Sequence, residues 1–216
     1  MKLSKRFAAA LLCVVMVLTA LTACGTATAK LDWENSRTKK YFESKGVTAQ
    51  EYSLNASITA SGQTVNMKYA IKGAQAGYEQ SVPGNSIQMR VDEEGNVYDQ
   101  MPSYGGKWRK ISASSDEAKS YAASLRVCMG YFTVPDADSV GSISAGEYQD
   151  GGETYYMETI KLHQNGIYAT YSYCYKGEEL SFILMESMGG MMNNIELKPT
   201  ADEKLLEIPQ NYLTVE

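Results

Sequence analysis

Residues 51–60 read EYSLNASITA and residues 63–72 read QTVNMKYAIK, with only Ser61 and Gly62 between them. In both segments apolar side chains alternate with polar ones, which is the two-residue period of a strand that buries one face. A short link containing glycine between two such segments is typical of a hairpin. The pair therefore predicts the first hairpin of an antiparallel sheet.

The same alternation recurs along most of the chain, interrupted by turns that carry Gly, Asn or Pro. Strands joined by such short turns pair with their sequence neighbours in an antiparallel meander. Further strands are predicted at 78–82, 87–91, 97–101, 108–111, 142–149, 154–162, 167–176, 180–186 and 191–198.

Two segments have a helical pattern instead. Residues 32–45 form the first helix, which Gly46 ends. The second begins at Ser114, which has the spacing of a capping box to Glu117, and carries apolar residues every three or four positions until Pro135 stops it. We therefore predict an α+β, mostly β fold: a strongly curved antiparallel meander, a half-open barrel of ten or eleven strands wrapped round one or two helices.

The first residues have the composition of a bacterial lipoprotein signal peptide. A basic start precedes an apolar run at 7–18 that is too short for a comfortable membrane span. The segment LTACG at 21–25 resembles the lipobox, in which the Cys is diacylated and becomes the first residue after cleavage. The alternative is an ordinary secretory signal cut near Ala23, with Cys24 incidental.

These features predict the organisation of the chain. Residues 1–23 are a signal peptide, residues 24–31 hold the lipidated Cys24 and a short tether, and residues 32–216 form a single domain. We expect the processed protein to be extracytoplasmic and anchored to the cell membrane by lipidated Cys24. Two acyl chains are sufficient for stable attachment.

The charge balance argues against a nucleic-acid partner. The chain has 20 Lys and Arg against 25 Asp and Glu, and the three basic residues Lys2, Lys5 and Arg6 leave with the signal peptide. The processed chain then carries a net charge of −8, whereas a phosphate-binding surface needs a clustered positive field.

Only two cysteines remain beside the lipidation site, Cys128 and Cys174. The compartment permits disulfides, so a bridge between them is one alternative. The other is two separate small hydrophobic side chains, since Cys128 falls on the apolar face of the second helix and Cys174 on the more polar face of a strand.

Three short segments carry a resemblance to a known family: Gly95-Asn96-Val97-Tyr98 followed by Met101-Pro102, then Gly106-Lys107-Trp108-Arg109-Lys110, and finally Ile208-Pro209-Gln210-Asn211-Tyr212. With the order of helices and strands, they make the chain similar to the lipoprotein-carrier superfamily, which includes LolA-like, LolB-like and LppX-type lipoproteins. The resemblance implies a curved sheet that wraps part-way round helices and lines an apolar groove on its concave side. It carries no catalytic signature.

Such a groove would suit an acyl chain or an apolar peptide. Its wall is predicted from the inward positions of several strands, and Met185 is predicted at its rim. The alternative is that the same side chains pack on the second helix and fill the core. The predicted wall residues are Leu54, Ile58, Met67, Tyr69, Met89, Tyr171, Tyr173, Phe182 and Leu184.

No motif for catalysis or for a resident metal emerges. The methionines of MESMGGMMNN at 185–194 could hold Cu(I), but strand ends packed around a Gly-Gly turn explain them better. The acidic residues at 92–94 lack the spacing of a calcium loop, and His163 has no second ligand nearby in sequence. We expect no enzyme activity, no cofactor and no metal.

Two functions remain open from the sequence. The first is a lipoprotein that holds a lipid, acyl chain or other apolar ligand in the groove. The second is an interaction or accessory module that contacts another envelope protein and binds no small molecule.

The lipobox gives a direct test. Cys24→Ser removes the acylated sulfur, so the protein should move from the membrane fraction into the medium or periplasm. Fractionation with labelled palmitate measures this. A serine variant that stays on the membrane, together with an unlabelled wild type, would contradict the lipoprotein prediction.

Overall fold

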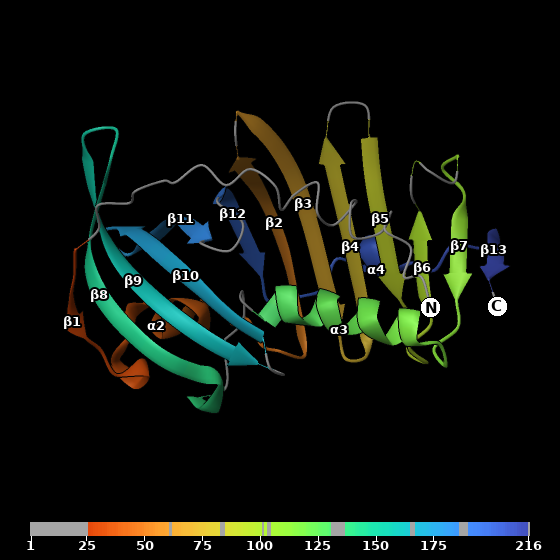
Figure 1. Ribbon diagram of the computed structural model, residues 1–216, viewed down its shortest axis with the longest axis horizontal. Coiled ribbons are helices and arrows are strands. Elements are labelled where there is room, and N and C mark those ends of the chain that lie inside the picture. The colour runs from red at the N-terminus through yellow and green to blue at the C-terminus, as the bar shows by residue number, and fades with distance from the viewer. Residues whose placement is uncertain are drawn as a thin grey trace. The chain divides into compact units, whose positions relative to one another are not determined.

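The computed structural model describes residues 26–60, 62–82, 85–100, 102, 105–130, 137–164, 167–185 and 190–215. Thirteen strands pair in the order β1-β8-β9-β10-β11-β12-β2-β3-β4-β5-β6-β7-β13 (Figure 1). The bounds of the strands are β1 Thr26–Lys30, β2 Glu51–Ala60, β3 Gln63–Lys72, β4 Gln75–Val82, β5 Asn85–Val91, β6 Val97–Gln100, β7 Trp108–Ile111, β8 Val140–Asp150, β9 Glu153–Gln164, β10 Ile167–Lys176, β11 Glu179–Met185, β12 Gly190–Lys198 and β13 Tyr212–Val215. The helices are α2 Arg37–Ser44, α3 Asp116–Gly130 and α4 Glu203–Leu206.

The predicted fold class, α+β and mostly β, is confirmed. Strands β2 to β7 lie side by side in sequence order, and so do strands β8 to β12. The order ends at β1 and β13, so the sheet is open. Figure 1 also shows β8, β9 and β10 bending along their length.

Two strands were not predicted. Residues 26–30, expected to be tether, form β1, which pairs antiparallel with β8, and β13 pairs parallel with β7. Both are short edge strands. The sequence TATAK of β1 has no large apolar side chain, so it gives no period-two signal even though its backbone groups can complete a sheet edge.

Contacts between residues divide the chain into two units. Unit 1 contains the chain up to Thr38 together with 58–64 and 137–193, and unit 2 contains 39–57, 65–136 and 194–216. Helix α2 and strands β2, β3 and β12 contribute residues to both.

In unit 1, a buried carboxylate holds the start of helix α2. Glu158 of β9 is 1% exposed and accepts hydrogen bonds from the backbone N–H groups of Arg37 and Thr38, both at 2.8 Å, and from the Thr38 hydroxyl at 2.7 Å. The Tyr156 hydroxyl donates a fourth bond at 3.1 Å. An anion at a helix N-terminus satisfies free N–H groups and opposes the helix dipole, so Glu158 acts as a cap from another part of the chain.

The face of this sheet that carries Glu158 also carries Tyr173 and Tyr175, and the Tyr175 hydroxyl donates to the Thr38 hydroxyl at 3.0 Å. Burial, with Glu158 as a smaller cause, raises the pKa of Tyr156 to about 12. The phenol therefore stays protonated and able to donate to Glu158.

The opposite face of unit 1 is also apolar. Tyr148, Met157, Cys174 and Phe182 form a buried cluster there. Cys174 is a free thiol that is fully buried, so its predicted place on a polar face is wrong; the side chain of Cys128 lies outside the described residues. Burial raises the pKa of the Cys174 thiol to about 12, and it packs as a small hydrophobic side chain.

In unit 2, an ion-pair cluster attaches helix α3 to the sheet. Asp99 of β6 is fully buried and accepts two hydrogen bonds from Arg109 of β7, from Nε at 2.9 Å and from Nη2 at 2.6 Å. Arg109 Nη2 also donates to Glu117 of α3 at 3.1 Å. The predicted capping box is therefore wrong: Ser115 caps the helix through Ala118 N–H, and Glu117 binds an arginine instead.

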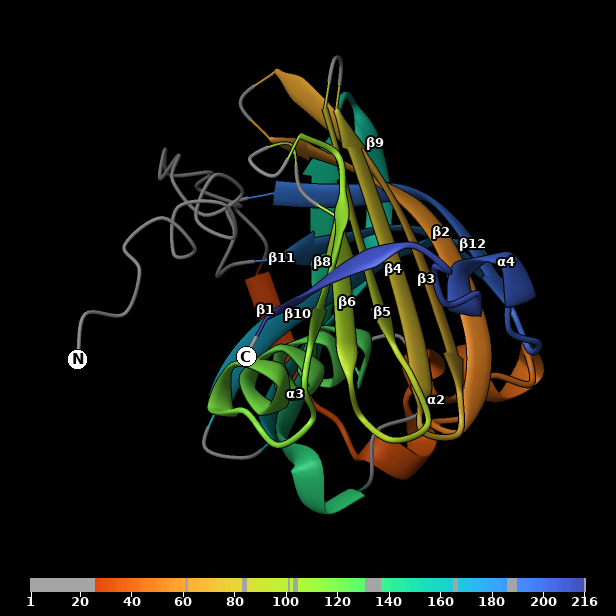
Figure 2. The same ribbon diagram turned by 90° about the vertical axis from the view of Figure 1, so that its right-hand side faces the viewer.

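Helix α4 packs on β4 and β5, on the face opposite to α3. Figure 2 shows α3 and α4 on opposite sides of these two strands. Leu205 and Leu206 are buried against Ala70. The approach is closest at Gly77 of β4, where an added Cβ would lie 2.0 Å from the carbonyl oxygen of Leu205. Only glycine leaves room for this contact.

The close approach predicts that Gly77→Ala is strongly destabilising. The new methyl group would meet the backbone of α4, so the variant should lose about 3 kcal/mol or more of unfolding free energy in urea titrations. Gly141→Ala on β8 is the control, since its Cβ would lie 3.3 Å from Lys161 O; it should cost about 1 kcal/mol or less. Equal losses of unfolding free energy in the two variants would contradict the close contact between Gly77 and Leu205.

The Glu158 cap gives a second stability test. Glu158→Gln presents an amide N–H₂ group to donors that need an acceptor, so it should cost about 2–4 kcal/mol. Glu153→Gln on the same strand removes only an exposed pair with Lys176 and should cost about 1 kcal/mol or less. Urea titration of both variants measures the difference, and a neutral Glu158→Gln would refute the capping role.

Candidate functional site

The predicted groove residues of strands β3 and β5 share one face. Tyr69 is the register partner of Tyr78, and Tyr78 is the partner of Met89. The same row continues through Asp99 to Arg109, which binds α3, so Met67, Tyr69 and Met89 lie on the α3 face. All three are buried, as are Leu54 and Ile58 of β2.

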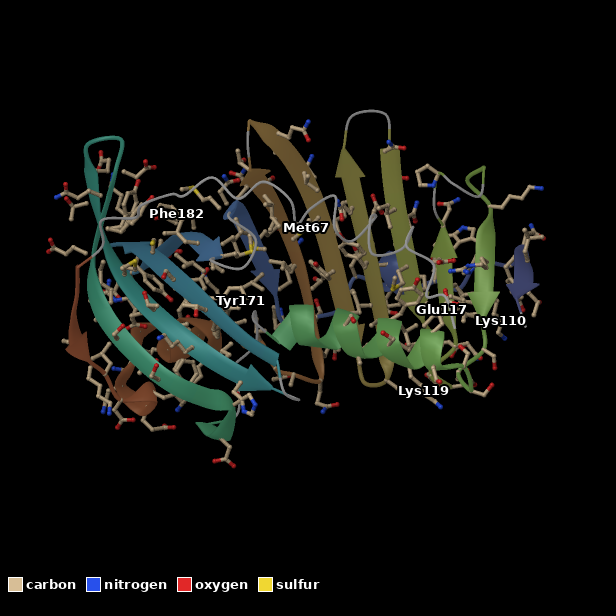
Figure 3. All side chains as sticks on the ribbon, in the orientation of Figure 1. Met67, Lys110, Glu117, Lys119, Tyr171 and Phe182 are labelled. Carbon is tan, nitrogen blue, oxygen red and sulfur yellow. The ribbon has the colours of Figure 1, made fainter. Side chains whose placement is uncertain are left out.

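On β10 and β11 the prediction is partly wrong. Tyr171 pairs with Met185 and Tyr173 pairs with Ile183, so Phe182 and Leu184 point to the opposite face from the two tyrosines. Strand β11 is apolar on both sides, and a period-two pattern cannot decide which side faces the helix. Figure 3 shows Met67 on β3, Tyr171 on β10 and Phe182 on β11.

Met185, predicted at the groove rim, is 2% exposed. That prediction is wrong, because the register places its side chain in the same buried row as Tyr171 and Ile160. Of the nine predicted wall residues, Leu184 alone is half-buried and the others are buried.

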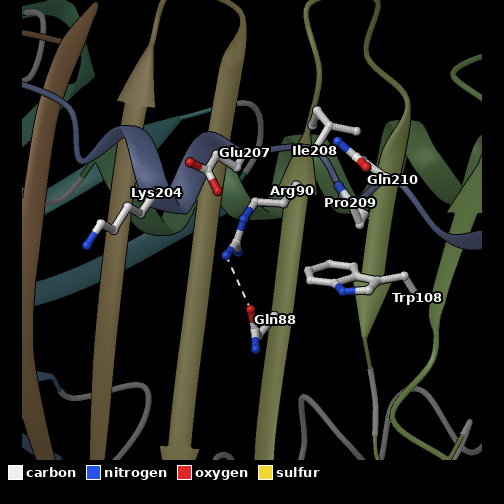
Figure 4. Close-up of a pocket in the computed structure, with 8 residues that line it drawn as sticks. All are labelled: Gln88, Arg90, Trp108, Lys204, Glu207, Ile208, Pro209 and Gln210. Carbon is white, nitrogen blue, oxygen red and sulfur yellow. Dashed lines mark hydrogen bonds between the residues drawn. The ribbon is translucent and has the colours of Figure 1, made fainter.

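A pocket of about 570 Å³ lies on the α4 face of unit 2 (Figure 4). Its side chains come from β5, β7, α4 and the link from α4 to β13. They include an aromatic ring, two cationic groups, one carboxylate and two amides. The lining residues are Gln88, Arg90, Trp108, Lys204, Glu207, Ile208, Pro209 and Gln210.

Strand alternation and α4 together place these residues. Gln88 and Arg90 are two apart on β5, and Arg90 is the register partner of Gly77, so both point to the α4 face. Asp202 caps α4 by accepting from Lys204 N–H at 3.1 Å. The chain then continues through 207–210 to β13, which lies beside Trp108.

Arg90 is the central charged group of the pocket and is 5% exposed. Its Nη1 donates to the carbonyl oxygens of Tyr78 at 3.0 Å and Met89 at 2.9 Å, and its Nη2 donates to Gln88 Oε1 at 3.2 Å. Its guanidinium carbon lies 5.5 Å from the centre of the Trp108 ring. Within the described part of the chain, its buried Nε has no hydrogen-bond partner.

Burial lowers the pKa of Arg90, and the charges of Glu79, Asp202 and Glu207 oppose that effect. A guanidinium starts from so high a pKa that it stays charged at neutral pH. No carboxylate of the described residues forms an ion pair with Arg90 at 4.0 Å or less.

The segments whose sequence resembles the lipoprotein carriers lie together beside this pocket. Trp108, Ile208 and Pro209 line it. Next to it, the Lys110 ammonium lies 5.5 Å from the Tyr98 ring centre and 5.7 Å from that of Tyr212. The Tyr98 and Tyr212 rings meet edge to face at 5.2 Å.

Sequence reasoning missed Arg90, Lys204 and Gln88 as site residues. Arg90 and Gln88 occupy the polar alternation of β5, which indicates solvent when no covering element is known. No local signal could have predicted that α4 covers this face, because α4 is only four residues long.

The other sequence candidates do not form sites in the described residues. Asp92 accepts hydrogen bonds from Asn96 N–H and Nδ2, both at 2.8 Å, and from the Tyr98 hydroxyl at 3.2 Å, so it shapes a turn. His163 is exposed, and Met192 is buried. No group of three or more His, Cys, Asp or Glu in the described residues could hold a metal. Among the same residues, no helix has the length and apolar character to cross a membrane.

Comparison with known proteins adds little. The chain matches no protein-family profile and no curated protein. A solved structure of an uncharacterized conserved protein from Thermus thermophilus aligns with a TM-score of 0.42 and 10% identity, over 83% of this chain and 94% of that one.

Proposed function

We propose that this chain is a lipid-anchored, extracytoplasmic envelope protein that acts by contacting another envelope protein and not by catalysis. The membrane link is the lipid on Cys24, which lies outside the described residues. The contact surface that we propose is strand β13.

The packing of the apolar side chains supports an interaction module. Eight of the nine residues expected to line an acyl groove are buried. Tyr69 stacks on Tyr78 with ring centres 4.8 Å apart, and the pair shares its face with the Asp99–Arg109 pair that holds α3. The side chains expected to line the groove are thus among those that pack in the interior, which supports a filled core.

Strand β13 is the observation that carries the proposal. It ends the order of the described sheet, so one of its edges faces no described strand. Its side chains Tyr212 and Leu213 are 40% and 55% exposed, although both are large and apolar. An exposed apolar edge strand is suited to pairing with an extended segment of another protein.

An acyl-carrier function is kept as a second proposal because of one observation in unit 1. The buried cluster of Tyr148, Met157, Cys174 and Phe182 is bordered by half-buried apolar side chains, namely Tyr155, Leu184 and Met191. A surface of this kind could accept an apolar ligand.

Cross-linking in cells tests the first proposal. A photoreactive residue at Leu213 should capture one envelope protein, whereas the same residue at exposed Lys119 on α3 should not. Leu213→Asp, next to a photoreactive residue at Tyr212, should reduce the capture at least about fivefold because a charge opposes burial.

Titration of the Cys24→Ser chain with a fluorescent fatty acid tests the second. Saturable binding that Leu184→Asp abolishes, with no protein captured at Leu213, would favour the carrier and contradict the edge-strand proposal. Capture at Leu213 without saturable fatty-acid binding would favour the interaction module.

A further inference from the structure

We propose that the pocket around Arg90 binds a small organic acid whose carboxylate takes the Nε edge of the Arg90 guanidinium. The site lies on the α4 face of unit 2 and includes neither the lipidation site nor Tyr212 or Leu213. The inference therefore goes beyond the proposed function and does not depend on it.

Arg90 has N–H donors that the described residues leave unused. A guanidinium has five N–H groups: one on Nε and two on each Nη. Both groups of Nη1 are used by backbone carbonyls, and Nη2 makes one bond to Gln88. Nε is buried with no described partner, and a donor left in that state costs free energy. The donors left over are therefore Nε–H and one N–H of Nη2, and a guanidinium can present Nε–H and an Nη2 N–H along one edge.

Arg109 shows what that edge binds in this protein. It lies two strands away on the opposite face, and its Nε and Nη2 both donate to the carboxylate of Asp99, at 2.9 and 2.6 Å. This fork is the geometry by which arginine pairs with a planar carboxylate. Arg90 has the same Nε edge, no carboxylate of the described residues forms an ion pair with it, and it lines a pocket.

The remaining lining residues define the ligand further. Lys204 adds a second positive charge, whereas Glu207 adds a negative one. A ligand with a carboxylate alone would be repelled by Glu207, so a hydrogen-bond donor next to the carboxylate fits better. An α-hydroxy or α-amino acid has this pair of groups. Trp108, Ile208 and Pro209 supply the apolar part of the wall.

We expect side-chain movement to give a carboxylate access to Arg90. Arg90 is buried, but Lys204, Glu207 and Gln210 at the pocket border are exposed. Exposed side chains change rotamer on the nanosecond scale, so we expect a carboxylate to reach the guanidinium without displacing a strand. The Trp108 ring and the backbone carbonyls of Tyr78 and Met89 keep the guanidinium in place.

Nitrogen NMR of the arginine side chains tests the proposal directly. The full processed chain with Cys24→Ser would be labelled at arginine Nε, and the Arg90 signal assigned by its loss in Arg90→Lys. Lactate and alanine should shift the Arg90 Nε–H signal saturably and leave that of Arg109 unchanged. Lactamide, which lacks the carboxylate, should leave both signals in place.

Two substitutions distinguish the contribution of Arg90 to ligand binding from that of Lys204. Arg90→Lys keeps one positive charge but loses the fork, so lactate affinity, followed by the change in tryptophan fluorescence, should fall about tenfold or more. Lys204→Gln should weaken it about threefold, and this exposed substitution does not threaten folding. Lys119→Gln on the opposite face is the control and should change nothing.

Three results would overturn the proposal. An Arg90 signal unchanged by lactate and alanine would mean that an ordered water or nothing at all occupies Nε. An equal shift of the Arg90 signal with lactamide would mean that Arg90 does not recognise the carboxylate of the ligand. A signal that grows linearly with lactate concentration and never saturates, in wild type and Lys204→Gln alike, would mean non-specific association.

Discussion

The close contact between Gly77 and the carbonyl oxygen of Leu205 is the constraint on which unit 2 depends. A side chain at residue 77 would overlap the α4 backbone, so α4 can lie on β4 only because this position is glycine. Helix α4 in turn carries Lys204 and leads into residues 207–210, which cover Arg90 and Trp108. The pocket therefore exists because one missing Cβ allows a helix of one turn to pack on a strand.

Buried carboxylates take part in holding two of the helices to strands. Glu158 caps α2 in unit 1, and Asp99 holds Arg109, which reaches Glu117 of α3 in unit 2. Each of these carboxylates has its hydrogen bonds filled by the chain itself. Arg90 is the contrasting case among the described residues, since its Nε lacks a partner. Buried charged groups that serve only packing usually have hydrogen-bond partners for all their polar atoms. A buried charged group that lines a pocket and lacks such a partner therefore indicates ligand binding.

The proposed contacts with other molecules use different parts of the chain. The lipid on Cys24 would hold the protein at the membrane, the exposed edge of β13 would pair with a protein segment, and Arg90 would bind a small acid. β13 and the pocket are joined by residues 208–211, since Ile208, Pro209 and Gln210 line the pocket and Tyr212 starts the strand.

The sequence by itself determined eleven of the thirteen strands, most of the turns, the second helix and the fold class, because alternation of apolar side chains is a local property that each of these strands carries. It also determined the lipobox as a candidate anchor. Only the tertiary structure decided which face of β11 meets the tyrosines of β10, since that strand is apolar on both sides and its register with β10 sets the choice. It alone decided that Met185 is buried and that Arg90, an outward residue by alternation, lies under α4. The reason is the same in both cases: a residue's environment depends on elements distant in sequence that pack against it, and no local period contains that information.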